Sequence, residues 1–291
     1  EENRRSYRDM LVTTDSLSDY VSGAILFDET IRQKTTTGKK FPDYLNEIGI
    51  ITGIKVDTGA KPFSCHRNEK ITEGLDNLPQ RMEEYKLLGV KFAKWRAVIT
   101  IGDRMPSSAC MIANAHALAR YASICQELDI VPIVEPEVLM DGSHNIDTCF
   151  KVTNEAQNIL FEALDKLDVN LTGIILKPNM VTSGSSCEKQ AIAEEIAELT
   201  IKCLAKNIPK EVPGIAFLSG GQSDENASNN LSHINKINSN PWKLTFSYGR
   251  ALQLEAMKKW CGDNNQNSEA QKIILKRAHF NSLAASGKYN L

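Results

Sequence analysis

The sequence predicts an α/β fold, a (β/α)8 TIM barrel formed by residues 1–291 as a single domain. Two observations predict it. Seven short apolar runs alternate with segments of helical period, which is typical of repeated βα units and a parallel sheet. Each run closes in charged, hydroxyl or glycine residues, and barrel enzymes carry their active sites at the carboxyl ends of the strands. A doubly wound sheet is the alternative, but no Gly-x-Gly-x-x-Gly follows any run.

The seven candidate strands share an apolar body and a polar end. They are residues 24–28, 51–57, 92–96, 130–137, 173–180, 214–221 and 244–250. Runs this hydrophobic are typical of strands that are covered on both faces, as in a parallel sheet.

Helices are predicted between the strands from apolar residues that recur every three or four positions. Ser223, followed by Asp224 and Glu225, is a good N-cap for one of them. The predicted helices are residues 112–128, 154–167, 191–206, 224–234 and 268–284.

Composition excludes several classes of protein. The net charge is −2 and the charged fraction 24%, so there is no basic signature of nucleic-acid binding. No apolar run approaches the roughly 18 residues of a membrane span, and residues 1–5 do not resemble a signal peptide. Seven cysteines without a Cys-x-x-Cys pair predict reduced thiols and a cytoplasmic location.

Lys177 is the candidate nucleophile, because it ends the apolar run 173–176 and is followed by Pro178. Desolvation at the rim of a core disfavours the ammonium form, and a free amine attacks carbonyl groups to form a Schiff base. The alternative is a lysine whose apolar stem is buried while its ammonium group reaches water.

Charged pairs end three other strands: Lys55 with Asp57, Lys94 with Arg96, and Glu135 with Glu137. Residues two apart in a strand point to the same face. A ring of cations would suit a substrate with more than one phosphate and would help keep an amine uncharged. The Glu135 and Glu137 carboxylates could exchange protons with a carbinolamine. Purely structural ion pairs are the alternative.

The last two strands end in residues that suit a phosphate group. Ser219 and Gly220 follow one strand, while Ser247, Gly249 and Arg250 follow the other. Glycines let main-chain N–H groups approach an anion, the next helix adds its positive end, and arginine adds a fork of donors. Ordinary strand-to-helix turns are the alternative.

A metal site is not expected, because the histidines form no pair with metal-ligand spacing. They are His66, His116, His144, His233 and His279.

Five strings, found in the same order along the chain, closely resemble class I fructose-bisphosphate aldolases. They are 92–96 (FAKWR), 133–137 (IVEPE), 176–181 (LKPNMV), 218–223 (LSGGQS) and 245–253 (TFSYGRALQ). The resemblance extends over essentially the whole chain, and five such strings together are highly specific.

The resemblance implies a metal-free, cofactor-free glycolytic and gluconeogenic lyase. Such enzymes reversibly cleave fructose 1,6-bisphosphate to dihydroxyacetone phosphate and glyceraldehyde 3-phosphate. It implies that Lys177 forms the Schiff base, that Glu135 is the acid and base, and that Glu137 and Lys94 lie beside the imine. It further implies a cytoplasmic homotetramer, and it allows cytoskeletal partners.

Phosphate-binding roles are implied in the same way. Ser219, Gly220, Gly249 and Arg250 resemble the site of the C1 phosphate, and Ser247 belongs to the same string. Lys55 resembles part of the opposite phosphate site, and Arg96 lies near the substrate.

Two departures from the family pattern lead to further expectations. Family members usually carry a further N-terminal segment with the first barrel strand and an aspartate implicated in proton transfer, and a C-terminal tail ending in tyrosine. Neither is found in this sequence, so we expect an unclosed seven-stranded sheet and poor activity of the chain alone. The alternatives are a catalytically impaired scaffold that binds sugar phosphates or proteins, and a related Schiff-base aldolase acting on monophosphates.

Overall fold

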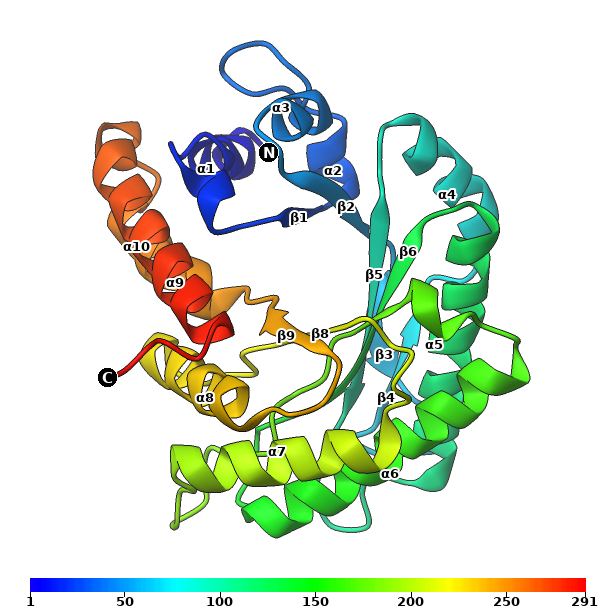
Figure 1. The fold of residues 1–291 in the computed structure, drawn as a ribbon. Coiled ribbons are helices and arrows are strands. Elements are labelled where there is room, and N and C mark those ends of the chain that lie inside the picture. Colours follow the sequence, from blue (N-terminus) through cyan, green and yellow to red (C-terminus); the bar gives the residue numbers. More distant parts are fainter.

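The computed structural model describes residues 1–291, and its central element is a curled parallel sheet of seven strands. Their order across the sheet is β1-β2-β5-β6-β7-β8-β9, and all six pairs are parallel. The strands are β1 (Gly23–Leu26), β2 (Ile51–Lys55), β5 (Phe92–Ile99), β6 (Val131–Val138), β7 (Ile175–Leu176), β8 (Gly214–Phe217) and β9 (Lys243–Phe246). The predicted barrel strands are therefore confirmed, and β1 and β9 are the unpaired ends of the sheet (Figure 1).

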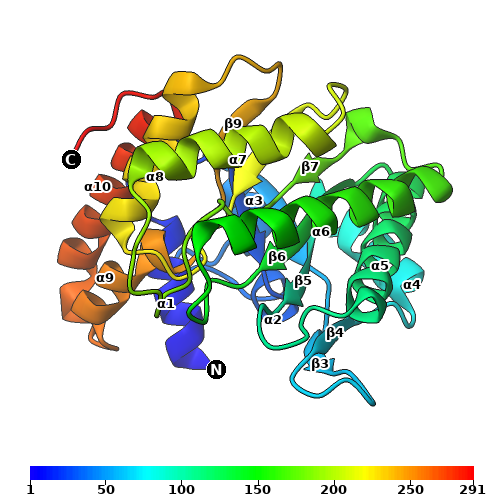
Figure 2. The same cartoon turned by 90° about the horizontal axis from the view of Figure 1, so that it is seen from below.

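Helices follow the strands and cover the outer face of the sheet (Figures 1 and 2). The larger ones are α1 (Glu2–Val12), α3 (Phe41–Glu47), α4 (Leu78–Leu87), α5 (Ser108–Glu127), α6 (Ile146–Lys166), α7 (Ala193–Asn207), α8 (Asp224–Ile237), α9 (Arg250–Trp260) and α10 (Asn267–Ala285). A single turn, α2 (Asp28–Ile31), follows β1. No helix is both long and apolar enough to cross a bilayer.

The start of one helix was predicted correctly, and the starts of two others were predicted too late. Ser223 caps α8 as predicted, because its hydroxyl oxygen accepts a hydrogen bond from the Asn226 N–H. Helix α5 begins four residues before the predicted start, since Ser107 caps it by accepting from the Cys110 N–H. Helix α6 begins eight residues early, capped in the same way by Asn145. Periodicity locates the body of a helix, and the capping residue determines its start.

A two-stranded antiparallel hairpin was not predicted. It consists of β3 (Gly59–Pro62) and β4 (Lys70–Glu73) and lies between β2 and α4. Both strands have only four residues, Gly-Ala-Lys-Pro and Lys-Ile-Thr-Glu, so neither is long enough to show the alternation by which a half-buried strand is recognised. The Thr72 hydroxyl donates to the Arg96 carbonyl oxygen, which fixes the hairpin against β5.

The hydrophobic core lies between the sheet and the helices. Its largest cluster contains 48 buried residues and extends along the chain from Val12 to Tyr289. In β5, Trp95 stacks on Tyr121 of α5, with ring centroids 5.6 Å apart. Because side chains alternate along a strand, Lys94 and Arg96 must point to the opposite, inner face of the sheet.

Candidate active site

Three neighbouring strands place one carboxylate between two lysines. Lys94 lies in β5 and Glu135 in β6, while Lys177 directly follows β7, where its N–H donates to the Val134 carbonyl oxygen (2.8 Å). The parallel ladder places Lys94, the third residue of β5, and Glu135, the fifth residue of β6, beside the end of β7, so lysines 41 and 42 positions from Glu135 in the sequence meet its carboxylate.

Both lysines contact the same carboxylate. Nζ of Lys177 lies 3.2 Å from Oε1 of Glu135, and Nζ of Lys94 lies 3.1 Å from Oε2 of the same carboxylate. Each of these residues is at most 8% exposed. Oε2 is buried and has no hydrogen bond of good geometry, despite the nearby lysine. An oxygen in this state can still exchange a proton with a substrate oxygen.

The environment of Lys177 favours its uncharged form. Burial is the main cause that lowers its pKa, and the positive charge of Lys94 acts in the same direction. The negative charges of Glu135 and Glu137 oppose this shift without reversing it. The net effect is a larger fraction of free amine at neutral pH than an exposed lysine would have.

A second ion pair lies further along the same two strands. Arg96 of β5 pairs through its Nε with Oε2 of Glu137 in β6. The Glu137 side chain is buried, whereas 41% of the Arg96 side chain is exposed. Arg96 therefore lies where the buried charges meet solvent, in a position to contact a ligand entering from outside.

Lys55, at the end of β2, is held by Asp57, a residue that the sequence analysis did not select for the site. Nζ of Lys55 donates to Oδ1 of Asp57 (2.6 Å) and to its carbonyl oxygen (2.8 Å). The buried Asp57 carboxylate also accepts from the N–H groups of Gly59 (3.1 Å) and Arg96 (3.3 Å). The sequence signal that could have selected Asp57 is its position two residues after Lys55, on the same face of a strand.

Asn179 is a second residue that the prediction missed. Its Oδ1 accepts from the Val138 N–H (3.0 Å), and its Nδ2 donates to the Thr153 hydroxyl (3.0 Å). These bonds connect the segment after Lys177 to the end of β6 and to α6. An asparagine two residues after the lysine was visible in the sequence, but its partners were not.

The loops after β8 and β9 also lie side by side. Gly220 and Gly221 have φ of 56° and 95°, a backbone conformation that favours glycine. A Cβ on Gly221 would lie 3.8 Å from Nη2 of Arg250, so the arginine fork lies beside this glycine turn. Arg250 is exposed and makes no hydrogen bond or ion pair with its side chain, which leaves all its donors free for a ligand.

The remaining predicted residues belong to the same two loops. Ser219 is buried, and its carbonyl oxygen accepts from the Gln222 N–H (3.0 Å). The Ser247 N–H donates to the Phe217 carbonyl oxygen (2.8 Å), and this bond ties the end of β9 to β8. Gly249 is exposed and directly precedes α9.

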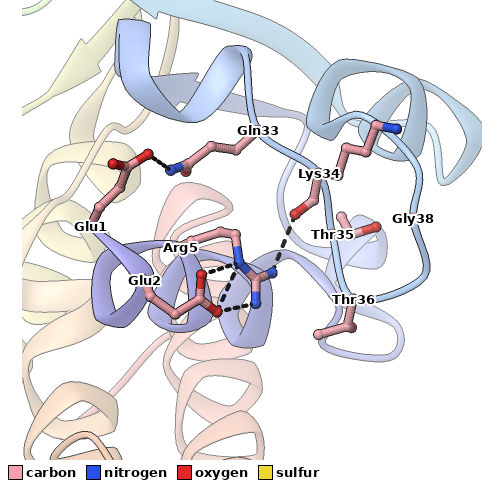
Figure 3. A pocket seen from close by; sticks show the side chains of 8 residues that line it. All are labelled: Glu1, Glu2, Arg5, Gln33, Lys34, Thr35, Thr36 and Gly38. Atoms are coloured by element: carbon pink, nitrogen blue, oxygen red, sulfur yellow. Dashed lines mark hydrogen bonds and ion pairs between the residues drawn. The ribbon is translucent and has the colours of Figure 1, made fainter.

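A separate hollow of about 760 Å³ lies between the start of α1 and the loop before α3 (Figure 3). Its lining residues are Glu1, Glu2, Arg5, Gln33, Lys34, Thr35, Thr36 and Gly38. The Arg5 guanidinium is neutralised by Glu2 and also donates to the Lys34 carbonyl oxygen. The hollow contains none of the strand-end residues, and the pKa shifts of Glu2 and Arg5 come from their pairing with each other, so we place the chemistry at the strand ends.

Metal-binding geometry is absent from the described residues, since no three His, Cys, Asp or Glu side chains are grouped to hold an ion. All seven cysteines are free thiols, and four of them are buried. What the strand ends bring together is a buried amine, carboxylates and two cationic regions, which is suited to imine chemistry on a phosphorylated carbonyl compound.

Comparison with known proteins agrees with this chemistry. The family model "Fructose-bisphosphate aldolase class-I", of the glycolytic group, matches residues 1–291. A protein of Xanthomonas axonopodis pv. citri named probable fructose-bisphosphate aldolase class 1 is 56% identical over 290 residues, which are 99% of this chain and 87% of that protein. The cytoplasmic isozyme of the spinach (Spinacia oleracea) aldolase is 48% identical, over 99% of this chain and 81% of its own length.

A solved structure has the same fold. The fructose-bisphosphate aldolase of Plasmodium falciparum, in complex with TRAP and a small-molecule inhibitor, superposes with a TM-score of 0.97 at 46% identity. The match covers 100% of this chain and 84% of that one.

Proposed function

The chain belongs to the class I fructose-bisphosphate aldolase family, and we propose that Lys177 is its Schiff-base nucleophile. The protein is a glycolytic lyase that reversibly cleaves fructose 1,6-bisphosphate to dihydroxyacetone phosphate and glyceraldehyde 3-phosphate. The observation that carries the assignment to Lys177 is its buried amine, which lies 3.2 Å from the Glu135 carboxylate with its pKa lowered by burial.

The first steps belong to Lys177 and Glu135. The free amine adds to the C2 carbonyl of the open-chain sugar, and the carbonyl oxygen becomes the hydroxyl of a carbinolamine. Glu135 then delivers a proton to this hydroxyl, which leaves as water, and the nitrogen becomes a protonated imine. The support for Glu135 is its position against the nucleophile and the buried oxygen that lacks an aligned hydrogen bond.

The protonated imine is the electron sink for cleavage. The bonding pair between C3 and C4 moves toward the iminium to give an enamine. The 4-hydroxyl gives its proton to the Glu135 carboxylate, which the loss of water has left unprotonated, and glyceraldehyde 3-phosphate leaves. Protonation of the enamine and hydrolysis then release dihydroxyacetone phosphate. Lys94 is proposed to keep Glu135 in place and Lys177 uncharged between turnovers. Glu137 is proposed to hold Arg96 toward the ligand.

Two cationic regions on either side of Lys177 in the strand order would bind the two phosphates. We assign the C1 phosphate to Ser219, Gly220, Ser247, Gly249 and Arg250, after β8 and β9. Support comes from the glycine turn beside the unpaired Arg250 guanidinium. The opposite phosphate is assigned to Lys55, after β2, with Arg96 near the substrate; Asp57 holds the lysine head in place.

Reductive trapping tests the nucleophile directly. Borohydride treatment in the presence of dihydroxyacetone phosphate should add the reduced adduct's mass to the peptide that contains Lys177, and the yield should not change in excess chelator. Lys189→Met, which removes an exposed lysine after the same strand, is the matched control and should label normally. An adduct on another lysine, or full labelling of Lys177→Met, would refute the assignment.

Trapping, combined with assays of substrate cleavage, separates the alternatives. A trapped adduct without measurable cleavage of fructose 1,6-bisphosphate would favour the sugar-phosphate or protein-binding scaffold. Faster turnover of fructose 1-phosphate than of the bisphosphate would favour a monophosphate aldolase, and would contradict the role of Lys55. Loss of labelling in chelator would contradict a metal-free, cofactor-free reaction.

Assembly and location are proposed from the family. We propose a homotetramer, to be checked by light scattering coupled to size-exclusion chromatography; a monomer at micromolar concentration would contradict it. A cytoplasmic location is supported by the relative named as a cytoplasmic isozyme. Protein partners, including cytoskeletal ones, are compatible with the Plasmodium aldolase having been solved with TRAP.

A further inference from the structure

A buried arginine on the last helix, outside the site described above, binds the start of α8, the helix that follows the glycine turn after β8. Arg277 of α10 is only 7% exposed. Its Nη2 donates to the carbonyl oxygen of Asp224 (2.5 Å) and to the hydroxyl of Ser228 (2.7 Å), both in the first turns of α8. The Ser228 hydroxyl in turn donates to Oδ1 of Asn281, also on α10 (2.7 Å).

The first turn of α8 is joined directly to the turn formed by Ser219, Gly220 and Gly221. Only Gln222 and the N-cap Ser223 lie between that turn and Asp224. Gln222 is itself fixed, since its Oε1 accepts from Nδ2 of Asn230 (2.7 Å). Any shift of the first turn of α8 would therefore be passed to the glycine turn within two residues.

The loop after β9 is tied to the same place. The hydroxyl of Tyr248 donates to the carbonyl oxygen of Ala227 in α8 (2.8 Å), and Tyr248 is buried next to Gly249 and Arg250. Ala227 directly precedes Ser228, so the Tyr248 phenol and the Arg277 guanidinium bind adjacent residues of α8. Arg277 is thus linked through the start of α8 to both loops.

This cluster contains more unpaired polar groups than a purely structural contact needs. Oδ2 of Asp224, Nε of Arg277 and Nδ2 of Asn281 are buried without a hydrogen bond, and the first two face each other across 3.9 Å. Unpaired buried polar groups destabilise a fold, so their presence here calls for an explanation.

We propose that Arg277 is a positioning residue that holds the glycine turn after β8 and the Arg250 loop after β9 in the arrangement that binds a phosphate group. This inference rests on the proposed assignment of the C1 phosphate to these loops. A planar fork suits the task, because one guanidinium nitrogen reaches two acceptors at the start of α8.

Substitution of Arg277 should change phosphate affinity without changing the chemistry. In Arg277→Lys we expect the inhibition constant of inorganic phosphate, competing with fructose 1,6-bisphosphate, to rise by about tenfold, the scale of one lost charge-assisted hydrogen bond. KM for the bisphosphate should rise in parallel, while kcat stays within about twofold, because no reacting atom is touched. Ser228→Ala, a smaller change, should show the same pattern to a lesser degree.

Lys276→Met is the matched control. Lys276 is the neighbour of Arg277 in sequence, and its ammonium group also lies over the Phe280 ring (5.5 Å). Its side chain makes no hydrogen bond or ion pair with α8. It should leave the inhibition constant and KM unchanged. If Arg277→Lys does not fold, as judged by circular dichroism, Ser228→Ala decides the question.

Failure of the role of Arg277 can be distinguished from failure of the proposed phosphate site. Wild-type inhibition by phosphate together with unchanged constants in both variants would overturn only the role of Arg277. A fall in kcat at constant KM would also overturn it, since that pattern indicates general damage. If inorganic phosphate does not compete in the wild type, the C1 phosphate assignment fails, and this inference fails with it.

Discussion

Lys177 owes its reactivity to burial and to two neighbouring charges that act in opposite directions on its pKa. Burial and the charge of Lys94 lower its pKa, while the Glu135 carboxylate raises it. A buried lysine without a carboxylate beside it would have no group to protonate the leaving hydroxyl. A lysine paired with a carboxylate in solvent would remain an ammonium ion. The balance gives Glu135 two separable effects, one on the pKa of the amine and one on proton transfer.

These two effects predict the behaviour of Glu135→Gln. Removing the negative charge should lower the pKa of Lys177 further, so the pH midpoint of adduct formation moves to lower pH than in the wild type. The maximal rate should fall by about 10²- to 10⁴-fold, because the general acid and base is lost. Single-turnover trapping of dihydroxyacetone phosphate with borohydride, followed over a pH series, measures both quantities.

Glu188→Gln provides the control for this experiment. Glu188 is an exposed carboxylate after the same strand and makes no ion pair, so its removal should leave the midpoint and the rate unchanged. A midpoint that moves to higher pH in Glu135→Gln would contradict the electrostatic account, even if the rate fell as expected.

At the scale of elements, β1, β2 and β5 lie close together because the side chain of Phe92 packs against two glycines that have no side chain to block it. The register places Phe92 of β5 opposite Gly53 of β2. A Cβ on Gly53 would lie 2.2 Å from the Phe92 ring, and one on Gly23 of β1 would lie 3.1 Å from it. The close packing of these strands therefore requires glycine at position 53; β2 ends at Lys55, and β5 carries Lys94 as its third residue.

Gly53→Ala should destabilise the protein by about 1–3 kcal/mol, because the added methyl group overpacks the ring. Urea denaturation measures the change. Phe92→Leu combined with Gly53→Ala should recover part of the loss, since the smaller side chain makes room. The double-mutant cycle then yields a coupling energy between the two positions.

Gly214→Ala tests whether the effect belongs to the contact or to glycine in a strand. Gly214 begins β8, and its Cβ would make only an ordinary contact with the Lys243 carbonyl oxygen (3.7 Å). We expect this change to be neutral or stabilising by up to about 1 kcal/mol, through the entropy of the unfolded chain. Equal destabilisation by both alanines would contradict the proposed ring contact.

At the scale of the molecule, a single core connects the first helix to the last residues. Its buried members extend from Val12 to Tyr289 and include both end strands of the sheet. No other cluster contains more than five buried residues. A core that is continuous along the chain supports the prediction, made from the regular alternation of strands and helices, that the chain is one domain.

We therefore expect one cooperative unfolding transition. Tryptophan fluorescence reports on Trp95 in β5, Trp242 before β9 and Trp260 at the end of α9, and far-ultraviolet circular dichroism reports on the helices. The two curves should coincide in urea. Two separated transitions would show that part of the sheet unfolds independently and would contradict the single-domain prediction.

Much of the fold was determined by local sequence patterns. The seven strands, their order of alternation with helices and the Ser223 cap follow from apolar periodicity, β-propensity and capping chemistry, which act within a few residues. The candidate residues at the strand ends could be selected for the same reason. In a parallel barrel, every strand delivers its carboxyl end to one side, so position along the strand is enough.

Only the tertiary structure decided which groups meet. Glu135 lies between Lys94 and Lys177 because β6 lies between β5 and β7. Neither these contacts nor the lowered pKa of Lys177 can be read from spacing. The roles of Asp57 and Asn179 depend on partners up to 41 positions away, and Arg277 acts on α8 from the last helix. Periodicity records whether a residue is buried, whereas hydrogen bonds and charge interactions act over a few ångströms in space, irrespective of distance along the chain.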